Sequence, residues 1–535
     1  MSDTILSIDH LRVEAPGGAV LVDDISLELK RGEVLGLIGE SGAGKSTIGL
    51  AALGYGRGGC RITSGEIRVS GTDLMAGGRA VRESLRGARV AYVAQSAADA
   101  FNPAMRIGAQ VIEGPLRHGI MDRRAAESWM RELFAALDLP SPDTFGERYP
   151  HQVSGGQLQR AMIAMAMSCR PDILVLDEPT TALDVTVQIE VLALLKRLIA
   201  RYRTAGLYIT HDLAVVAQVA DRLMVLRHGK LVETGETGRL ITQPDADYTR
   251  RLVAEREGAL AGTGAHHQAG EPLLTVEAVT AGYGKTTVLE TVSCRIARGE
   301  TLAVVGESGS GKSTLARVVT GLLSPGSGTV RFAGETLPAN YRRRSREQLR
   351  RIQLVYQLPD VALNPRQTIG EIIGRPASFY FGLKGRALAA EVERLLAQIG
   401  LPAEFATRLP SALSGGQKQR VCLARALAAK PDLIICDEVT SALDPLVAEE
   451  ILRLLRSLQD DLKLAYLFIT HDLGVVRRLA DRTMVMQRGG VVETGPTAAI
   501  FEPPYEPYTG RLIASIPELR TDWLDEVMAR RAEPA

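Results

Sequence analysis

Cysteine is scarce in this chain, and its arrangement excludes several classes of site. The five cysteines among the 535 residues are far apart, and no two form a C-x-x-C pair. Zinc sites and iron–sulfur clusters usually need closely spaced thiolate ligands, so neither is expected. An odd and scattered set is also a poor disulfide framework, which favours a reducing, cytoplasmic compartment.

Long apolar runs are missing as well. No stretch approaches the roughly 20 apolar residues that a membrane-spanning helix needs. Residues 1–6 have neither the basic region nor the apolar core of a signal peptide. We therefore expect the chain itself to be soluble.

The chain also lacks an excess of charge of either sign. Lys and Arg total 63, whereas Asp and Glu total 62. The overall basic surface typical of nucleic-acid-binding proteins is therefore absent. We interpret the local arginine run within residues 342–351 as the solvated face of a helix.

What the chain does contain is a phosphate-loop pattern, G-x-x-x-x-G-K-S-T, which occurs twice. Each copy follows an apolar run predicted to be a buried strand and precedes a predicted helix, which is the context that the motif requires. In such a loop, backbone N–H groups surround a phosphate, the lysine reaches the β- and γ-phosphates, and the first hydroxyl binds Mg²⁺. We predict two ATP sites, with binding residues Gly39, Ser41, Gly42, Gly44, Lys45, Ser46 and Thr47 in the first copy and Gly306, Ser308, Gly309, Gly311, Lys312, Ser313 and Thr314 in the second.

The spacing of the shared motifs indicates a duplicated domain. The loops begin 267 residues apart, at 39 and 306, and the Ser-Gly-Gly-Gln, Asp-Glu and Thr-His-Asp motifs recur 260 residues apart. A period of this length is too long for a solenoid repeat. We predict domains at residues 1–256 and 272–535. Residues 257–271 have no apolar period and are predicted to be a flexible linker, whose two histidines have no third ligand nearby.

Each copy alternates apolar strands with helical stretches. Strand-rich regions at 4–38 and 273–305 precede the loops, helical stretches are expected at 106–138 and 368–399, and strands at 207–210 and 466–470 end on Thr-His-Asp. Buried parallel strands that alternate with helices predict an α/β sheet with its ligand at the carboxyl ends of the strands.

Candidate catalytic residues follow the predicted strands. Asp177 is expected to hold Mg²⁺ together with Ser46, and Glu178 to orient and deprotonate the attacking water. His211 is predicted to sense the γ-phosphate, and Gln95 offers an amide to the metal or the water. An acidic pair can instead cap a helix, but its position behind a phosphate loop favours catalysis. The second copy repeats the set as Asp437 with Ser313, Glu438, His471 and Gln357.

Together these motifs resemble the ATP-binding-cassette ATPases over nearly the whole chain, twice. The resemblance implies two tandem domains, each with a RecA-like α/β core, an antiparallel β subdomain and a helical subdomain. It also implies a head-to-tail sandwich, in which ATP on one domain's phosphate loop is covered by the other domain's signature. Lys45 would face the signature Ser414, Gly415, Gly416 and Gln417, and Lys312 would face Ser154, Gly155, Gly156 and Gln157.

The same resemblance suggests roles for two further positions. Asp184 and Asp444, in the sequences Thr-Ala-Leu-Asp and Ser-Ala-Leu-Asp, match the loop through which the two sites communicate. An aromatic side chain ahead of the phosphate loop usually stacks on adenine. Tyr283 supplies it in the second copy, whereas residues 11–18 of the first contain no aromatic. We expect apolar contact from Val13 to recover much of the difference.

A narrower similarity lies near the end of the chain. Residues 504–517 resemble the Pro-Tyr-Thr tail of oligopeptide, dipeptide and nickel importer ATPases, and residues 247–252 are a weaker first copy. Phe101-Asn102-Pro103 and Leu363-Asn364-Pro365 also resemble that subfamily, in which this segment receives the permease's coupling helix. Departures are few: Val153 replaces the usual signature leucine, and Cys436 and Val439 flank the second acidic pair.

The resemblance implies an ATPase subunit at the cytoplasmic face of the cell membrane that energises import of peptides or related solutes. Its implied partners are two separate transmembrane permease subunits and, through them, an extracytoplasmic solute-binding protein, with one copy of this chain per transporter and no nucleic acid. The alternative is a soluble twin-cassette ATPase acting on ribosomes or nucleic acid. The short uncharged linker and the lack of a cysteine cluster disfavour it, and the tail disfavours an exporter. The solute stays open among peptides, opines, glutathione and nickel.

Overall fold

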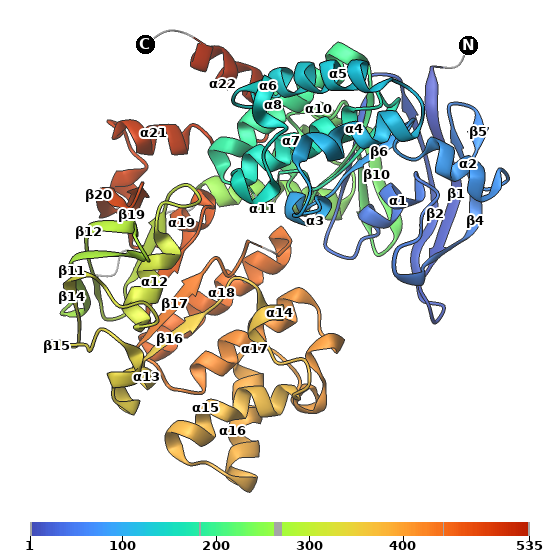
Figure 1. Cartoon of the computed structure of the whole chain (residues 1–535). Helices are drawn as coiled ribbons and strands as arrows, with labels where there is room; N and C mark the ends of the chain where they lie inside the picture. The colour runs from blue at the N-terminus through green and yellow to red at the C-terminus, as the bar shows by residue number, and fades with distance from the viewer. Residues whose placement is uncertain (1–2, 181–182, 262–269, 442, 533–535) are drawn as a thin grey trace. The chain divides into compact units, whose positions relative to one another are not determined.

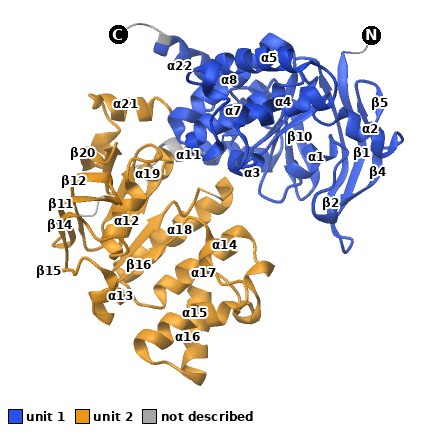
Figure 2. Cartoon of the chain, viewed as in Figure 1, with its two compact units in different colours: residues 1–257, 517–535 blue, residues 258–516 orange. Residues whose placement is uncertain are grey.

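The computed structural model describes residues 3–180, 183–261, 270–441 and 443–532. Its contacts divide the chain into unit 1, residues 1–257 with 517–535, and unit 2, residues 258–516 (Figure 2). Predicted linker residues 262–269 lie outside the described residues, as do Thr181, Ala182 and Ala442 of the two Ala-Leu-Asp loops.

The core of unit 1 is a six-stranded sheet. Its central strands are apolar and buried along their whole length, as expected for parallel strands that are covered on both faces. All neighbouring strands run parallel except the last pair, β9 with β10, which is antiparallel. In sheet order the strands are β6 (Val90–Val93), β7 (Ile173–Asp177), β8 (Ala205–Ile209), β3 (Val34–Ile38), β9 (Arg222–Arg227) and β10 (Lys230–Glu236).

A second, antiparallel sheet forms the β subdomain of unit 1, where Figure 1 shows β1, β2 and β4 as long strands. Inward-facing apolar residues alternate with exposed polar ones along β2, as one buried face requires. In sheet order its strands are β2 (Val20–Lys30), β1 (Thr4–Glu14), β4 (Arg61–Val69) and β5 (Thr72–Asp73).

The helices of unit 1 cover the six-stranded sheet and build a helical subdomain. Helix α1 packs on β7 and β8, while α4, α5 and α7 contact one another. The helices are α1 (Lys45–Ala51), α2 (Gly78–Leu85), α3 (Ala97–Ala100), α4 (Ile107–Arg117), α5 (Arg123–Ala136), α6 (Pro142–Phe145), α7 (Gly155–Met167), α8 (Val185–Tyr202), α9 (Leu213–Val216), α10 (Thr237–Thr242), α11 (Asp247–Ala261) and α22 (Trp523–Ala532), with 3-10 helices η1 (Arg57–Gly59) and η2 (Pro150–Gln152).

Unit 2 repeats both sheets with the same strand order and sense. The six-stranded sheet is β16 (Ile352–Val355), β17 (Leu433–Asp437), β18 (Ala465–Ile469), β13 (Thr301–Val305), β19 (Arg482–Gln487) and β20 (Gly490–Pro496). The antiparallel sheet is β12 (Thr286–Ala297), β11 (Pro272–Tyr283), β14 (Ser327–Phe332) and β15 (Glu335–Thr336).

The helices of unit 2 follow the same plan, with α15, α16 and α17 forming the helical subdomain. They are α12 (Lys312–Thr320), α13 (Arg346–Arg351), α14 (Pro359–Ala362), α15 (Ile369–Phe381), α16 (Gly385–Gln398), α17 (Gly415–Leu427), α18 (Pro445–Leu462), α19 (Leu473–Leu479), α20 (Thr497–Ile500) and α21 (Pro507–Ile513), with 3-10 helices η3 (Tyr341–Arg343), η4 (Ala403–Thr407) and η5 (Pro410–Ala412). The predicted combination of α/β core, antiparallel β subdomain and helical subdomain is confirmed in each unit.

Two segments differ from the sequence-based picture. Helix α11 continues to Ala261, so residues 257–261 of the predicted linker are helical. These residues include alanine and leucine, which favour a helix even without an apolar period. The strands before the histidines begin and end slightly earlier than predicted, at Ala205–Ile209 and Ala465–Ile469.

The end of the chain returns to unit 1, which the sequence analysis did not anticipate. Figure 2 draws α22 in the colour of unit 1, and the helix contacts α8. Gln218 donates from Nε2 to the carbonyls of Glu518 and Arg520 at 2.9 and 2.8 Å, and its Oε1 accepts from the N–H of Leu524 at 3.1 Å. Trp523 and Leu524 are buried. This C-terminal segment is therefore part of the packing of unit 1.

Among the described residues, none of the helices combines the length and the apolarity that crossing a bilayer would require.

Candidate functional site

The phosphate loops begin where β3 and β13 end, at the carboxyl edge of each parallel sheet. Their first glycines, Gly39 and Gly306, have φ of 150° and 146°. A Cβ on Gly39 would lie 2.1 Å from the carbonyl oxygen of Leu226, and one on Gly306 would lie 2.1 Å from that of Met486. Glycine is therefore required at this position both by the backbone angle and by the close approach of the neighbouring strand.

The lysine of each loop folds back over the loop's own backbone. Lys45 Nζ donates to the carbonyls of Gly39 and Glu40 at 2.6 and 2.9 Å, and Lys312 Nζ repeats this with Gly306 and Glu307 at 2.7 and 2.8 Å. Both lysine residues are buried. A buried ammonium group that donates to carbonyl oxygens of its own loop is well suited to accept an anion such as a phosphate.

The serine after the lysine and the first carboxylate form the next part of each site. Ser46 Oγ donates to Asp177 Oδ1 at 2.9 Å, and Ser313 Oγ donates to Asp437 Oδ1 at 3.0 Å. Burial raises the pKa of both aspartates despite these hydrogen bonds. Mg²⁺ usually takes only one or two oxygen ligands from a protein, and its other ligands are waters and phosphate oxygens. A hydroxyl beside a carboxylate matches that small set of protein ligands. The residues present therefore fit Mg²⁺ with a nucleotide.

The second carboxylate is held by an amide and an imidazole. Gln95 Nε2 donates to Glu178 Oε2 at 2.9 Å, and His211 Nδ1 lies 2.9 Å from Glu178 Oε1. In unit 2, Gln357 Nε2 donates to Glu438 Oε2 at 2.7 Å, and His471 Nδ1 lies 3.5 Å from Glu438 Oε1. The predicted glutamines, glutamates and histidines thus come together in both units.

Charge coupling is evident within these groups. Burial alone would lower the pKa of His211 and His471, but the hydrogen bond and charge of the adjacent glutamate raise the pKa of each. Burial alone would raise the pKa of Glu438, but His471, Lys312 and Gln357 lower it. The Glu438 carboxylate is therefore kept ionised next to an imidazole that readily takes a proton.

Both glutamates have an unusual backbone conformation. Glu178 and Glu438 have φ of 49° and 51°, the left-handed region that non-glycine residues rarely occupy. Each backbone N–H donates at 2.9 Å to the last carbonyl of the adjacent strand, Ile209 or Ile469. Strain of this kind persists where the surrounding structure dictates it, commonly at functional sites. In this conformation each glutamate side chain faces the glutamine and the histidine at the ends of the parallel strands.

The signature segments begin helices α7 and α17. Ser154 and Ser414 are the N-caps, accepting from the N–H groups of Gln157 and Gln417 at 3.3 and 3.4 Å. The two glutamines complete capping boxes by accepting from the serine N–H groups.

One glycine of each signature is needed for packing. A Cβ on Gly156 would lie 2.6 Å from Val187, and one on Gly416 would lie 2.3 Å from Val447. By contrast, Gly155 has open space around its Cα and Gly415 only an ordinary contact. Each signature thus starts a helix whose second residue must be glycine to pack against α8 or α18.

The adenine candidates differ between the units. Tyr283 ends β11 with 44% of its surface exposed, and its hydroxyl accepts from Arg317 at 2.7 Å. Val13 is only 1% exposed, because strand alternation turns it towards the core. The contact expected from Val13 is therefore not supported, since its side chain already packs inside unit 1.

Sequence reasoning missed one side chain in the first site. Tyr92, on β6, donates from its hydroxyl to Asp177 Oδ2 at 2.6 Å, and its pKa is raised by burial and by that carboxylate. Tyr92 is paired with Val175 of β7. In unit 2 the residue paired with the corresponding Ile435 of β17 is Leu354, so Leu354 takes the place of Tyr92 there. A tyrosine in an otherwise apolar strand beside the acidic strand was the available signal.

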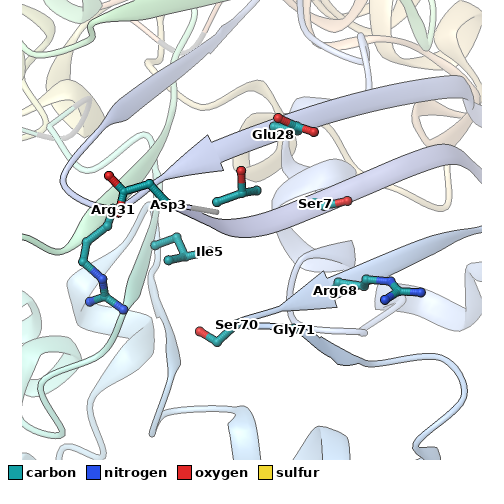
Figure 3. A pocket seen from close by; sticks show the side chains of 9 residues that line it. Asp3, Ile5, Ser7, Glu28, Arg31, Arg68, Ser70 and Gly71 are labelled. Atoms are coloured by element: carbon teal, nitrogen blue, oxygen red, sulfur yellow. The ribbon is translucent and has the colours of Figure 1, made fainter. Parts of the chain in front are cut away.

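A hollow of about 550 Å³ lies elsewhere, on the β subdomain of unit 1 (Figure 3). Ser7 on β1 is paired with Glu28 on β2 and with Arg68 on β4, so the hollow follows three adjacent strands. It shares no lining residue with the site just described. The residues that line it are Asp3, Thr4, Ile5, Ser7, Glu28, Arg31, Arg68, Ser70 and Gly71.

Comparison with known proteins agrees with this geometry. The profile of the family described as "ABC transporter" matches residues 22–181 and 289–441, one stretch in each unit. The chain belongs to the ABC transporter family. A second profile, "Oligopeptide/dipeptide transporter, C-terminal region", matches residues 492–535 of this ABC chain and includes the tail at 504–517.

Curated relatives of this ABC chain match nearly all of it. The glutathione import ATP-binding protein GsiA of Escherichia coli (strain K12) is 38% identical over 96% of this chain and 89% of that protein. The protein of the same name from Salmonella choleraesuis (strain SC-B67) is 37% identical over 96% and 90%. The solved structure of cbiO1 from Clostridium perfringens, part of the ABC transporter complex cbiONQ, is 30% identical with a TM-score of 0.40, over 43% of this chain and 91% of that one.

Proposed function

We infer that this chain is the ATP-hydrolysing subunit that energises an importer of peptides or related small solutes through a separate membrane permease. The observation that carries this inference is the double set of side chains at the two sheet edges. Ser46 with Asp177, and Gln95 with Glu178 and His211, recur as Ser313 with Asp437, and Gln357 with Glu438 and His471. The oligopeptide/dipeptide tail match and the glutathione-import relatives support the importer class.

The residues of each site divide the work of hydrolysis. Lys45 and the N–H groups of its loop bind the phosphates, and Ser46 and Asp177 hold Mg²⁺, which neutralises phosphate charge when bound. Glu178 orients the attacking water and takes its proton. Its carboxylate is held in position by donors from Gln95 and His211. His211, whose pKa is raised by the adjacent Glu178 carboxylate, positions the glutamate and senses the γ-phosphate.

We further propose that each ATP is covered by the signature of the other unit. Lys45 would then share a nucleotide with Ser414 and Gly416, and Lys312 with Ser154 and Gly156. The capped helix starts support this role, since N-terminal N–H groups and a serine hydroxyl suit a phosphate. Asp184 and Asp444, which cap α8 and α18, would link the two sites.

The remaining partners are inferred from the same class. We propose two transmembrane permease subunits, an extracytoplasmic solute-binding protein that delivers the solute to them, and one copy of this chain per transporter at the cytoplasmic face of the membrane. The described helices that follow Gln95 and Gln357, α3 and α14, are the proposed docking points for the permease. The family and tail matches do not favour the ribosome- or nucleic-acid-directed alternative.

Substitution of the two glutamates tests the enzymatic part. Glu178→Gln and Glu438→Gln should each reduce ATP turnover by about 10²-fold or more, the range typical of a lost general base, while leaving ATP binding intact. The double variant should retain ATP under conditions in which the wild type releases phosphate. Undiminished phosphate release by either single variant would show that its glutamate is not the base.

Transport assays test the importer part. Reconstitution of the chain with its permease subunits should give ATP-dependent uptake of solute into cells, or into vesicles whose lumen holds this chain and ATP. Glutathione and short peptides are the first solutes to try. ATP-dependent efflux instead of uptake would exclude the importer assignment without affecting the ATPase assignment.

A further inference from the structure

The tails of the two units reach their own phosphate loops. The backbone N–H of Glu40 donates to the hydroxyl of Tyr248 at 3.2 Å, and the N–H of Glu307 donates to the hydroxyl of Tyr508 at 3.1 Å. Tyr248 and Tyr508 are the second residues of α11 and α21, which carry the two copies of the Tyr-Thr tail. The same contact is thus made twice, by segments whose surrounding sequences differ.

This contact completes the hold on one peptide group. The carbonyl of Gly39 and the N–H of Glu40 belong to the same peptide, and that carbonyl accepts from Lys45 Nζ at 2.6 Å. In unit 2 the peptide between Gly306 and Glu307 is held in the same way, with Lys312 Nζ at 2.7 Å. Each loop therefore starts with a peptide plane fixed between an ammonium group at one end and a phenol at the other.

That peptide is one of the points at which the loop could otherwise change shape. It follows a glycine, and glycine lets its adjoining peptide rotate at little steric cost. The lysine is also the group that must serve a phosphate, so its grip on the carbonyl is not permanent. The tyrosine hydroxyl makes no comparable contribution to nucleotide chemistry and can hold the N–H throughout.

The tyrosines are themselves firmly anchored. Tyr248 and Tyr508 are 6% and 2% exposed. Ahead of Tyr248, the Glu233 carboxylate of β10 accepts from the N–H groups of Asp245 and Ala246 at 2.8 and 3.1 Å. After Tyr508, the Thr509 hydroxyl donates at 2.6 Å to Glu493, the equivalent glutamate of β20. Each hydroxyl is therefore presented to the loop by a segment tied to the edge of the same sheet.

We propose that Tyr248 and Tyr508 are positioning residues that hold the first peptide of each phosphate loop, so that the N–H groups after it keep the arrangement that binds the triphosphate. This gives the tail motif a role at the nucleotide. The inference rests on the proposed phosphate-loop sites.

The test removes one hydroxyl and keeps the ring. In the full chain, Tyr508→Phe is placed in a Lys45→Ala background, so that ATP titration reports the second site. Loss of one buried hydrogen bond should weaken ATP binding there about five-fold. Hydrogen exchange of the loop amides at residues 306–313 should become faster, while exchange in β17 and β18 stays unchanged.

A matched control separates positioning from general stability. Tyr466→Phe removes another buried tyrosine hydroxyl of unit 2, one that donates to the carbonyl of Leu455 at 3.0 Å. It should lower the melting temperature about as much as Tyr508→Phe and leave ATP affinity unchanged. Equal loss of ATP affinity in both variants, or unchanged affinity and loop exchange in Tyr508→Phe, would overturn the proposal.

Kinetics give a second readout. The double variant Tyr248→Phe/Tyr508→Phe should raise KM for ATP about five-fold with kcat within about two-fold, because loop shape contributes to ground-state and transition-state binding alike. A fall in kcat at unchanged KM would refute positioning. A wrong assignment of the ATP sites themselves would give a different result: the double variant Lys45→Ala/Lys312→Ala would still bind ATP.

Discussion

The two ATP sites should differ in how strongly they bind adenine. Tyr283 presents a 44% exposed ring at the end of β11, ahead of the second phosphate loop. Its hydroxyl accepts from Arg317 on α12, the helix that follows that loop, which ties the ring to the same part of unit 2. A base stacked on such a ring gains about 1–3 kcal/mol, by analogy with single-stranded nucleic acids.

The segment ahead of the first phosphate loop offers no equivalent ring. Residues 11–18 contain no aromatic, and Pro16 at the corresponding distance is exposed. Val13, which sequence reasoning assigned as partial compensation, is 1% exposed and packs in the core of unit 1. The expected difference in ATP affinity is therefore about ten-fold, within the roughly 5- to 150-fold range that about 1–3 kcal/mol represents.

Lysine variants separate the two sites in one assay. ATP titration of the Lys45→Ala chain reads the second site, and titration of Lys312→Ala reads the first. The Lys45→Ala chain should bind ATP about ten-fold more tightly than the Lys312→Ala chain does. Adding Tyr283→Ala to the Lys45→Ala chain should remove most of that difference in affinity. Tyr341→Ala, which removes another exposed tyrosine of unit 2, is the control and should have no effect. Equal affinities of the two lysine variants would refute the reasoning.

Two further predictions concern stability. The pKa of His211 is raised because Glu178 favours the protonated imidazole in the folded chain. This contribution to the free energy of unfolding is complete below the ordinary histidine pKa near 6.5 and is lost as the pH rises through the pKa of the folded state. Thermal melting from about pH 6 to about pH 8 should therefore fall more in the wild type than in His211→Gln, and parallel curves would contradict this. Leu524 of α22 is 1% exposed, so Leu524→Ala should destabilise unit 1 by about 2–3 kcal/mol in chemical denaturation. Lys196→Ala, which removes an exposed ion pair to Asp525, should cost less than about 1 kcal/mol. A Leu524→Ala cost that is equally small would show that α22 does not stabilise unit 1.

Local sequence patterns predicted the repeated core because each pattern has one dominant physical cause. The wholly apolar run at Val34–Ile38 is compatible with a parallel strand buried on both faces, and it is β3. Ser154 and Ser414, each three residues before a glutamine, match capping boxes, and both start helices there. The meeting of Gln95, Glu178 and His211 also follows from sequence, since strand ends of a parallel sheet lie at one edge.

Long-range contacts were the part that sequence could not supply. Nothing local indicates that Gln218 binds backbone groups more than 300 positions later, or that Tyr248 accepts from Glu40. Such pairs depend on how separate elements pack, not on periodicity. The misplaced role of Val13 has a different cause: a position ahead of the loop does not say which face of the strand the side chain occupies.

Among the groups that would carry out hydrolysis, the two units differ mainly at the imidazole, which lies 2.9 Å from the glutamate in unit 1 and 3.5 Å in unit 2. The serine–aspartate pair and the glutamine–glutamate contact have matching distances, within about 0.2 Å of one another in units 1 and 2. Around the nucleotide, the differences lie in Tyr92, which donates to Asp177 where unit 2 has Leu354, and in Tyr283, which has no counterpart ahead of Gly39. Tyr92 and Tyr283 affect the free energy of binding Mg²⁺ and adenine, but they do not contact the proposed attacking water. Any inequality between the sites should therefore appear in nucleotide and Mg²⁺ affinity, while the rates of the two filled sites stay similar.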